Sequence, residues 1–512
     1  MKRSLVLVIY LAVGFVLYGF SFGSPFLLDD EFQILNNPQV LDLSNIFLNF
    51  TNSTMAMSHG MGGVYYKPVM MIIYNLLWNG GGGSAVPFHV FQLLIHVANS
   101  FLIFNLFQRL LTDDRKLWAF FAGLLFLCHP ANSESVLMIA DLQEPLYTFF
   151  GLAGLLILST TSKWAWTAAV FFLFSLLSKE SGLLYLLIAP AYCYLFERNR
   201  FRWAGGTTIA ATVIYLALRL GVAELSSLQA HNMQISQADF LTRILSLPKI
   251  LVHYVYLFFT LERPSLTQDW VVSNATLADF WFPLGQIVIL LGVLIYSFYG
   301  KPRKEYLFLM LWVILGLGLH SQIIPLDGTV SDRWVYFPII GAIGVSLWLL
   351  KKSFAAPKRI KMVFLLVITL SCSISTFART RYWVNPMTLY RQDLKGQPDS
   401  FYLNNNLGLE LLKEKNFAEA IPFFEKTIAV SKKDSRESLV GYRNLGAAYL
   451  ELKDYTKAEE CFRVALAEQD VRSYRAMVLV LSLQNKEVEF ASVLKTALDK
   501  FPADSILLRF KK

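Results

Sequence analysis

Long apolar runs dominate this 512-residue chain and make a water-soluble fold a poor expectation. Hydrophobic residues make up 55% of it and charged residues only 16%, and a run of about twenty apolar residues is long enough for a membrane helix. The segment 244–260 contains Pro248, Lys249 and His253, so we expect it to lie at the membrane interface. We expect eleven crossings, near residues 5–22, 86–108, 117–138, 143–160, 164–178, 181–196, 203–221, 281–299, 306–322, 334–350 and 361–378.

The distribution of positive charge orients these crossings. If the N-terminus faces the cytoplasm, it and the inner loops hold 17 of the 24 Lys and Arg residues before residue 379, as cytoplasmic loops do. An odd number of crossings then places the C-terminal region outside, in a periplasm or an organelle lumen. Most of the excess positive charge that gives the net charge of +9 lies where anionic inner-leaflet lipid would attract it. The charge is therefore no sign of a nucleic-acid partner. The four cysteines have no metal-ligand spacing, so we expect no zinc site.

The chain divides into two segments of different composition. Residues 1–378 form the expected membrane domain, with a large first outer loop at 23–85, and residues 379–512 are polar with an amphipathic helical period. In the second part Gly408 and Gly446 are each followed by matching small or large residues at +3, +12, +16 and +19. This pattern is typical of tetratricopeptide repeats, which we place near 401–434 and 439–470, with a weaker repeat at 471–504. Such repeats bind a protein or peptide.

Ionisable residues on the outer side are few. The acids near the membrane are Asp29, Asp30, Glu31, Glu134, Asp141, Glu144, Glu180 and Asp332, and the outer cations are Lys67, Lys179, Arg219, Arg243, Lys249, Arg263 and Arg333. Transfer of a sugar from a polyprenyl phosphate needs a base for the acceptor hydroxyl and cations for the leaving phosphate, both at headgroup depth. This side of the chain supplies both.

Asp29 and Asp30 directly follow the first apolar run and are our candidate bases. The alternative is a solvated loop start or a helix cap for the following segment. Binding of a divalent cation by the pair is a further alternative, because hard cations favour carboxylate oxygens. We expect no other metal or cofactor.

Three later segments carry further candidates. The sequence HPANSESV interrupts an apolar run and contains His129, Asn132 and Glu134; a proline kink satisfied by its neighbours is the equal alternative. Lys179 and Glu180 divide two apolar runs, where a self-paired turn is the simpler interpretation. Arg333, beside Asp332 and close to Tyr336, is our first choice for the donor phosphate because a guanidinium suits phosphate better than an ammonium does. Lys179 and Lys67 are the other candidates.

The ordered series LLDDEFQILNNPQV, YYKPVMMIIYNLLW, FHVFQLLIHVANSFLIF, HPANSESV, KESGLL and DRWVYFPIIG, followed by the repeats, resembles the transmembrane and tetratricopeptide-repeat O-mannosyltransferases and their bacterial relatives. These are glycosyltransferases of the GT-C fold. The resemblance implies an all-α fold, in which a polytopic GT-C bundle of about eleven helices precedes a tetratricopeptide-repeat α-solenoid. It maps the acidic pair onto Asp29 and Asp30 and implies a polyprenyl-phosphate sugar donor. Asp332 stands where the family more usually has Glu.

From these observations we expect an integral-membrane glycosyltransferase that acts on a protein hydroxyl at the non-cytoplasmic face. The animal members carry more repeats, which favours a bacterial inner-membrane protein with a periplasmic C-terminal domain, or an endoplasmic reticulum protein in a eukaryote. Two alternatives stay open. One is an outer-leaflet oligosaccharide ligase or polymerase, and the other is a non-catalytic membrane scaffold that presents its repeats to a partner.

Overall fold

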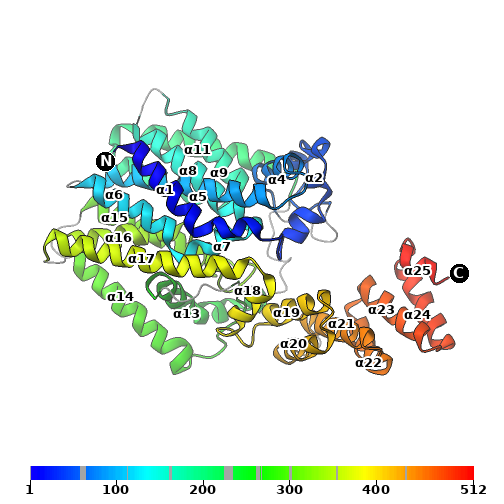
Figure 1. Ribbon diagram of the computed structural model, residues 1–512. Helices are drawn as coiled ribbons and strands as arrows, with labels where there is room; N and C mark the ends of the chain where they lie inside the picture. Colours follow the sequence, from blue (N-terminus) through cyan, green and yellow to red (C-terminus); the bar gives the residue numbers. More distant parts are fainter. Residues whose placement is uncertain are drawn as a thin grey trace. The chain divides into compact units, whose positions relative to one another are not determined.

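A computed structural model describes residues 2–57, 65–111, 114–160, 164–223, 234–260, 266, 268–298, 303–352, 356–432 and 435–511. The chain forms two compact units, Met1–Val384 and Asn385–Lys512. Both are helical in every described stretch of secondary structure, apart from one antiparallel bridge between Gln268 and Val330 (Figure 1). The all-α architecture predicted from the sequence is therefore confirmed.

The first unit is a bundle of long helices with short helical turns between them. Its α-helices are α1 (Arg3–Tyr18), α2 (Pro38–Leu41), α3 (Leu48–Thr51), α4 (Pro68–Gly80), α5 (Val86–Leu110), α6 (Arg115–Cys128), α7 (Ser133–Leu137), α8 (Gln143–Thr160), α9 (Thr167–Ser178), α10 (Leu183–Phe196), α11 (Phe201–Arg219), α12 (Gln234–Gln237), α13 (Phe240–Phe259), α14 (Phe282–Phe298), α15 (Lys304–Leu319), α16 (Pro338–Lys352) and α17 (Lys358–Trp383). The turns are η1 (Gly19–Gly23), η2 (Glu31–Leu35), η3 (Leu43–Asn45), η4 (Pro130–Asn132), η5 (Ile139–Leu142), η6 (Glu180–Gly182), η7 (Arg198–Arg200), η9 (Leu277–Trp281) and η10 (Asp332–Val335).

Every expected crossing contains a helix, but the helices differ in length. Among the described residues, six segments are long and apolar enough to cross a membrane: Arg3–Gly23, Val86–Leu110, Ile139–Thr160, Phe240–Phe259, Leu277–Ser297 and Lys358–Trp383. Others are shorter; α6, for instance, has 14 residues, since the helix ends before Pro130. The chain is a multi-pass membrane protein, and the count of eleven crossings stays a prediction.

Helix α13 has the length of a crossing, but its contacts run across one end of the bundle. Near its start, Arg243 donates to the carbonyl of Ile323 at 3.2 Å, just beyond the C-terminal end of α15. Near its end, the carbonyl of Phe258 lies 3.1 Å from Nε2 of His129, just beyond the C-terminal end of α6. Turns η4 and η10, which follow these two helix ends, are in contact. Both ends of α13 therefore lie at the same level of the bundle.

A polar stripe on α5 explains how the bundle tolerates the broken segment between α6 and α8. Backbone groups freed by a helix break must find partners when no water is present. Gln92 donates to the carbonyls of Ser135 and Met138, both at 2.7 Å, and Asn99 donates to that of Pro145 at 2.8 Å. From one continuous helix, Gln92 thus holds the irregular segment and Asn99 holds the start of α8.

The second unit consists of paired helices. They are α18 (Pro386–Leu394), α19 (Phe401–Lys413), α20 (Phe417–Val430), α21 (Arg436–Glu451), α22 (Tyr455–Ala465), α23 (Val471–Leu483), α24 (Glu487–Lys500) and α25 (Ser505–Arg509), with the turn η11 (Leu466–Glu468). A Cβ on Gly408 would lie 2.6 Å from the ring of Phe424, and a Cβ on Gly446 would lie 2.6 Å from that of Phe462. The small and large residues of each repeat therefore pack on one another.

Candidate functional site

The two adjacent aspartates have different environments. Asp30 is 1% exposed, and both of its carboxylate oxygens accept backbone hydrogen bonds: Oδ2 from Leu27 at 2.8 Å and Oδ1 from Ala140 at 2.6 Å. Burial raises the pKa of Asp30, and these two donors oppose that effect. Asp30 thus ties the first loop to turn η5, in a buried position where both oxygens already accept hydrogen bonds.

Asp29 is the available carboxylate of the pair. It keeps an exposed surface, and among the described residues no hydrogen bond reaches its carboxylate oxygens. Desolvation by the surrounding protein raises its pKa, while Arg333 and Lys67 are close enough to lower it and Asp327 close enough to raise it. The structure therefore brings a free carboxylate and two cations into one neighbourhood.

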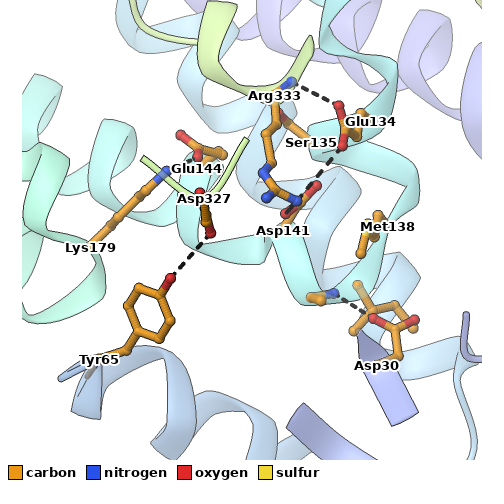
Figure 2. Close-up of polar contacts among 12 residues, drawn as sticks. Asp30, Tyr65, Glu134, Ser135, Met138, Asp141, Glu144, Lys179, Asp327 and Arg333 are labelled. Carbon is orange, nitrogen blue, oxygen red and sulfur yellow. Dashed lines mark hydrogen bonds and ion pairs between the residues drawn. The ribbon is translucent and has the colours of Figure 1, made fainter. Parts of the chain in front are cut away.

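Arg333, on turn η10, lies between two buried acids (Figure 2). Its backbone N–H donates to Oε2 of Glu134 at 2.9 Å. One guanidinium nitrogen, Nη1, donates to Oδ1 of Asp141 at 3.2 Å and lies 3.8 Å from Oε1 of Glu134. Glu134 comes from α7 and Asp141 from η5, so the broken segment supplies both partners of the guanidinium.

The turn that carries Lys179 and Glu180 is engaged by other elements rather than paired with itself. Lys179 forms an ion pair with Glu144 of α8, which Figure 2 also shows. Glu180 accepts a hydrogen bond from Arg219, at the end of α11, at 2.5 Å. The self-paired turn considered from the sequence is therefore not what forms.

Lys67 has no acidic partner among the described residues. Its side chain is buried with 8% exposure, and no carboxylate oxygen of those residues lies within ion-pairing distance of its ammonium. The ammonium lies 4.2 Å from the ring centroid of Tyr65, whose hydroxyl donates to Asp327 at 3.1 Å. Burial lowers the pKa of Lys67. An unpaired buried cation of this kind suits an anionic ligand.

Four other predicted residues have structural partners. His129 accepts from the backbone N–H of Ala131 through Nδ1 at 3.2 Å, and its ring stacks on that of Phe258. Asn132 donates to the carbonyl of Phe126 at 2.8 Å. The Tyr336 hydroxyl lies 2.8 Å from Nδ1 of His96, within the bundle core, while buried Asp332 lies 3.5 Å from Nε2 of His253.

Sequence reasoning gave no role to several residues that the structure places here. Asp141 and Glu144 were counted among the outer acids, but nothing in the sequence shows that they pair with Arg333 and Lys179. Asp327 and Tyr65 were given no role, although Tyr65 begins the motif YYKPVMMIIYNLLW. The signal for Asp327 was present, since it stands six positions before Arg333 in the same outer loop.

No cluster of three or more His, Cys, Asp or Glu side chains suited to a metal ion occurs in the described part of the chain. Because both oxygens of Asp30 accept backbone hydrogen bonds, the pair Asp29 and Asp30 does not present two free carboxylates to a divalent cation. The fold and site together define a multi-pass helical membrane protein with a charged site at one end of its bundle and an additional repeat domain.

Comparisons with known proteins agree with this class. A family model of the tetratricopeptide repeat matches residues 399–467. The chain is 24% identical to the protein O-mannosyl-transferase TMTC3 of Homo sapiens over 487 residues, which cover 86% of this chain and 52% of that protein. It is 23% identical to the protein O-mannosyl-transferase F38B6.6 of Caenorhabditis elegans, with 81% and 62% covered. It is also 29% identical to the protein O-mannosyl-transferase tmtc2 of Xenopus laevis over 194 residues, 35% of this chain and 23% of that protein.

These relatives confirm the resemblance expected from the ordered motifs. The chain spans about half the length of TMTC3 and less than two thirds of the nematode protein. No solved structure gives a significant match.

Proposed function

We propose that the chain is a glycosyltransferase that moves a sugar from a polyprenyl-phosphate-linked donor to a hydroxyl of a protein Ser or Thr on the non-cytoplasmic face of a membrane. The names of the relatives, protein O-mannosyl-transferases, support the reaction class. The observation that carries the proposal is that the unbonded carboxylate of Asp29 lies near both Arg333 and Lys67.

In this reaction Asp29 is the base. Its ionised carboxylate takes the proton of the acceptor hydroxyl while the hydroxyl oxygen attacks the anomeric carbon. The bond between that carbon and the phosphate oxygen breaks, and its electron pair leaves with the polyprenyl phosphate. The phosphodiester thereby becomes a phosphomonoester and gains one negative charge. Asp30 is a poorer candidate, because it is buried and both of its oxygens accept backbone hydrogen bonds.

The cations stabilise that new charge. Arg333 was the first choice from the sequence, but its guanidinium already serves two carboxylates, and Lys179 serves Glu144. Lys67 keeps its N–H donors free of acidic partners among the described residues. We therefore assign Lys67 the direct contact with the phosphate, and Arg333 an electrostatic contribution from the adjacent position.

The lipid tail of the donor and the protein acceptor contact different parts of the chain. Membrane lipid surrounds the bundle, whose exposed apolar side chains include those of α14, and the isoprenoid tail of the donor shares this environment. The tetratricopeptide repeats bind the protein acceptor. The mannose of the relatives' names is the first sugar to test.

The test is transfer of labelled mannose from a polyprenyl phosphate to a Ser/Thr peptide by the purified full chain in lipid nanodiscs. We expect Asp29→Asn to lower transfer by about 10²- to 10⁴-fold, the usual contribution of a general base. Asp42→Asn is the matched control, since Asp42 lies in the same loop and its side chain caps η3 by accepting from the N–H of Ser44, a role that asparagine can also fill. Normal transfer by Asp29→Asn would remove the proposed base.

The two alternatives correspond to other results of the same assay. Use of a lipid-linked oligosaccharide, with no use of a lipid-linked monosaccharide, would favour the ligase or polymerase. Absence of transfer from either donor, together with partner binding that depends on the repeats, would favour the scaffold.

A further inference from the structure

We propose that Asp30 is a positioning residue, which together with Tyr74 and Gln92 fixes residues 138–140 so that the next residue, Asp141, holds the Arg333 guanidinium at the site. The role of Arg333 in this inference rests on the proposed function. The placement of the turn does not.

Three side chains from different parts of the fold form hydrogen bonds with the backbone of residues 138–140, one with each residue. The carbonyl of Met138 accepts from Gln92 of α5 at 2.7 Å. The carbonyl of Ile139 accepts from the hydroxyl of Tyr74 of α4 at 2.7 Å, and the N–H of Ala140 donates to Asp30 at 2.6 Å. All three side chains are buried. The carbonyl of Met138 also accepts from the N–H of Asp141 at 3.1 Å. The three side chains add the partners that this irregular stretch lacks because it is not part of a continuous helix.

Asp141 depends on this support, because little else holds its side chain. One oxygen, Oδ1, accepts from Arg333 at 3.2 Å, whereas the buried Oδ2 has no hydrogen-bond partner. A shift of the turn therefore moves the only bonded oxygen relative to the guanidinium. A displacement of about 1 Å at a positioned group can cost about 100-fold in rate. Figure 2 shows Asp30 and Arg333 on opposite sides of the segment that carries Met138 and Asp141.

A carboxylate group suits this position better than the carboxamide of an asparagine. Its two oxygens accept from Leu27 and Ala140 at the same time, and charged acceptors make the stronger hydrogen bonds. In Asp30→Asn one carboxylate oxygen becomes an amide nitrogen, which is a donor. It would face a backbone donor, so one of the two N–H groups loses its partner.

The experiment combines hydrogen exchange with kinetics on the full chain in nanodiscs. For Asp30→Asn we expect faster amide exchange in peptides that cover 138–141 and a KM for polyprenyl-phosphate mannose raised by about 10- to 100-fold. The acid limb of the pH–rate profile should persist, because Asp29 is still present. Asp42→Asn is the control and should change neither exchange at 138–141 nor KM.

A second variant protects the test against misfolding. Tyr74→Phe keeps the ring and removes only the hydroxyl that binds Ile139, so we expect the same pattern with a smaller amplitude. Unchanged exchange at 138–141 in both variants would overturn the proposal. Loss of the acid limb in Asp30→Asn at unchanged KM would also overturn it, because Asp30 would then be the base. If the wild-type chain transfers no sugar while exchange responds as expected, the proposed function fails and the positioning of the turn stands.

Discussion

At the scale of single residues, the two neighbouring aspartates show how burial and hydrogen bonding assign different roles to identical side chains. Both carboxylate oxygens of Asp30 accept hydrogen bonds from backbone N–H groups. Asp29 lies within electrostatic reach of Arg333 and Lys67, and no described residue donates a hydrogen bond to its carboxylate. The sequence marks both as candidates but cannot separate them. The separation depends on a contact with Ala140, which is 110 positions away along the chain.

The raised pKa of Asp29 predicts the pH dependence of transfer. A base acts in its ionised form, so activity should fall as pH drops through the raised pKa. The midpoint of this acid limb should lie above about 3.9, the ordinary value for aspartic acid. The measurement is the pH–rate profile of the wild-type chain beside that of Asp29→Asn, whose residual activity should lack the limb. An identical limb in both would assign the titration to another group.

The same shift predicts an effect on stability of the opposite sign. Because the pKa of Asp29 is higher in the folded than in the unfolded chain, the folded chain binds this proton more tightly, and this group's contribution to stability falls as pH rises between the two values. At pH 7 the ionised carboxylate is therefore a cost. We expect Asp29→Asn to unfold at the same or a higher temperature than wild type at pH 7. A clear loss of thermal stability would contradict the raised pKa assigned to Asp29.

Lys67 can be tested against a lysine in a similar aromatic setting. Lys249 lies 4.8 Å from the ring centroid of Trp270, but it is half-exposed and pairs with Asp279 at 2.8 Å. We expect Lys67→Met to raise the donor KM and lower kcat, because it removes the charge that faces the phosphate, and Lys249→Met to leave both unchanged. Equal kinetics for the two variants would indicate that Arg333, and not Lys67, contacts the donor phosphate.

At the scale of elements, the polar stripe of α5 is the feature that sequence reasoning used least. Its Gln and Asn residues could be recognised only as part of a motif, since their partners are carbonyls of the distant segment that contains Met138 and Pro145. The apolar runs and the repeat pattern, by contrast, were readable because they depend on local composition and period. The helix break at His129 could be predicted for the same reason. The short helix and the turns that follow it could not.

The stripe makes a stability prediction. Gln92→Leu leaves the carbonyls of Ser135 and Met138 without a side-chain donor in a buried position, which should cost about 1–3 kcal/mol. Asn105→Leu, on the same helix, is the matched control, because Asn105 donates to the carbonyl of Phe101 one turn before it. Thermal unfolding in nanodiscs measures the difference. A Gln92→Leu variant no less stable than Asn105→Leu would show that the broken segment does not depend on α5.

At the scale of the whole molecule, a charge bias predicted the feature that makes the site possible. The concentration of lysines and arginines in alternate loops predicts that the first loop and the 323–333 loop lie on one side of the membrane. The structure brings Asp29 of the first loop close to Arg333 of the other. The pairing of Arg333 with Asp141 could not be predicted from the sequence, since it depends on how the broken segment between α6 and α8 folds.

The most direct measurement is the sidedness of these two loops. Phe47 is 79% exposed in the first loop and Ile324 is 65% exposed in the other, while the native cysteines are buried and should react little. Phe47→Cys, Ile324→Cys and the cytoplasmic control Lys116→Cys are labelled singly with a membrane-impermeant maleimide in sealed vesicles of known orientation. We predict that the first two react from the non-cytoplasmic side and the third only from the cytoplasmic side. Labelling of Phe47→Cys and Ile324→Cys from opposite sides would contradict a shared site for Asp29 and Arg333.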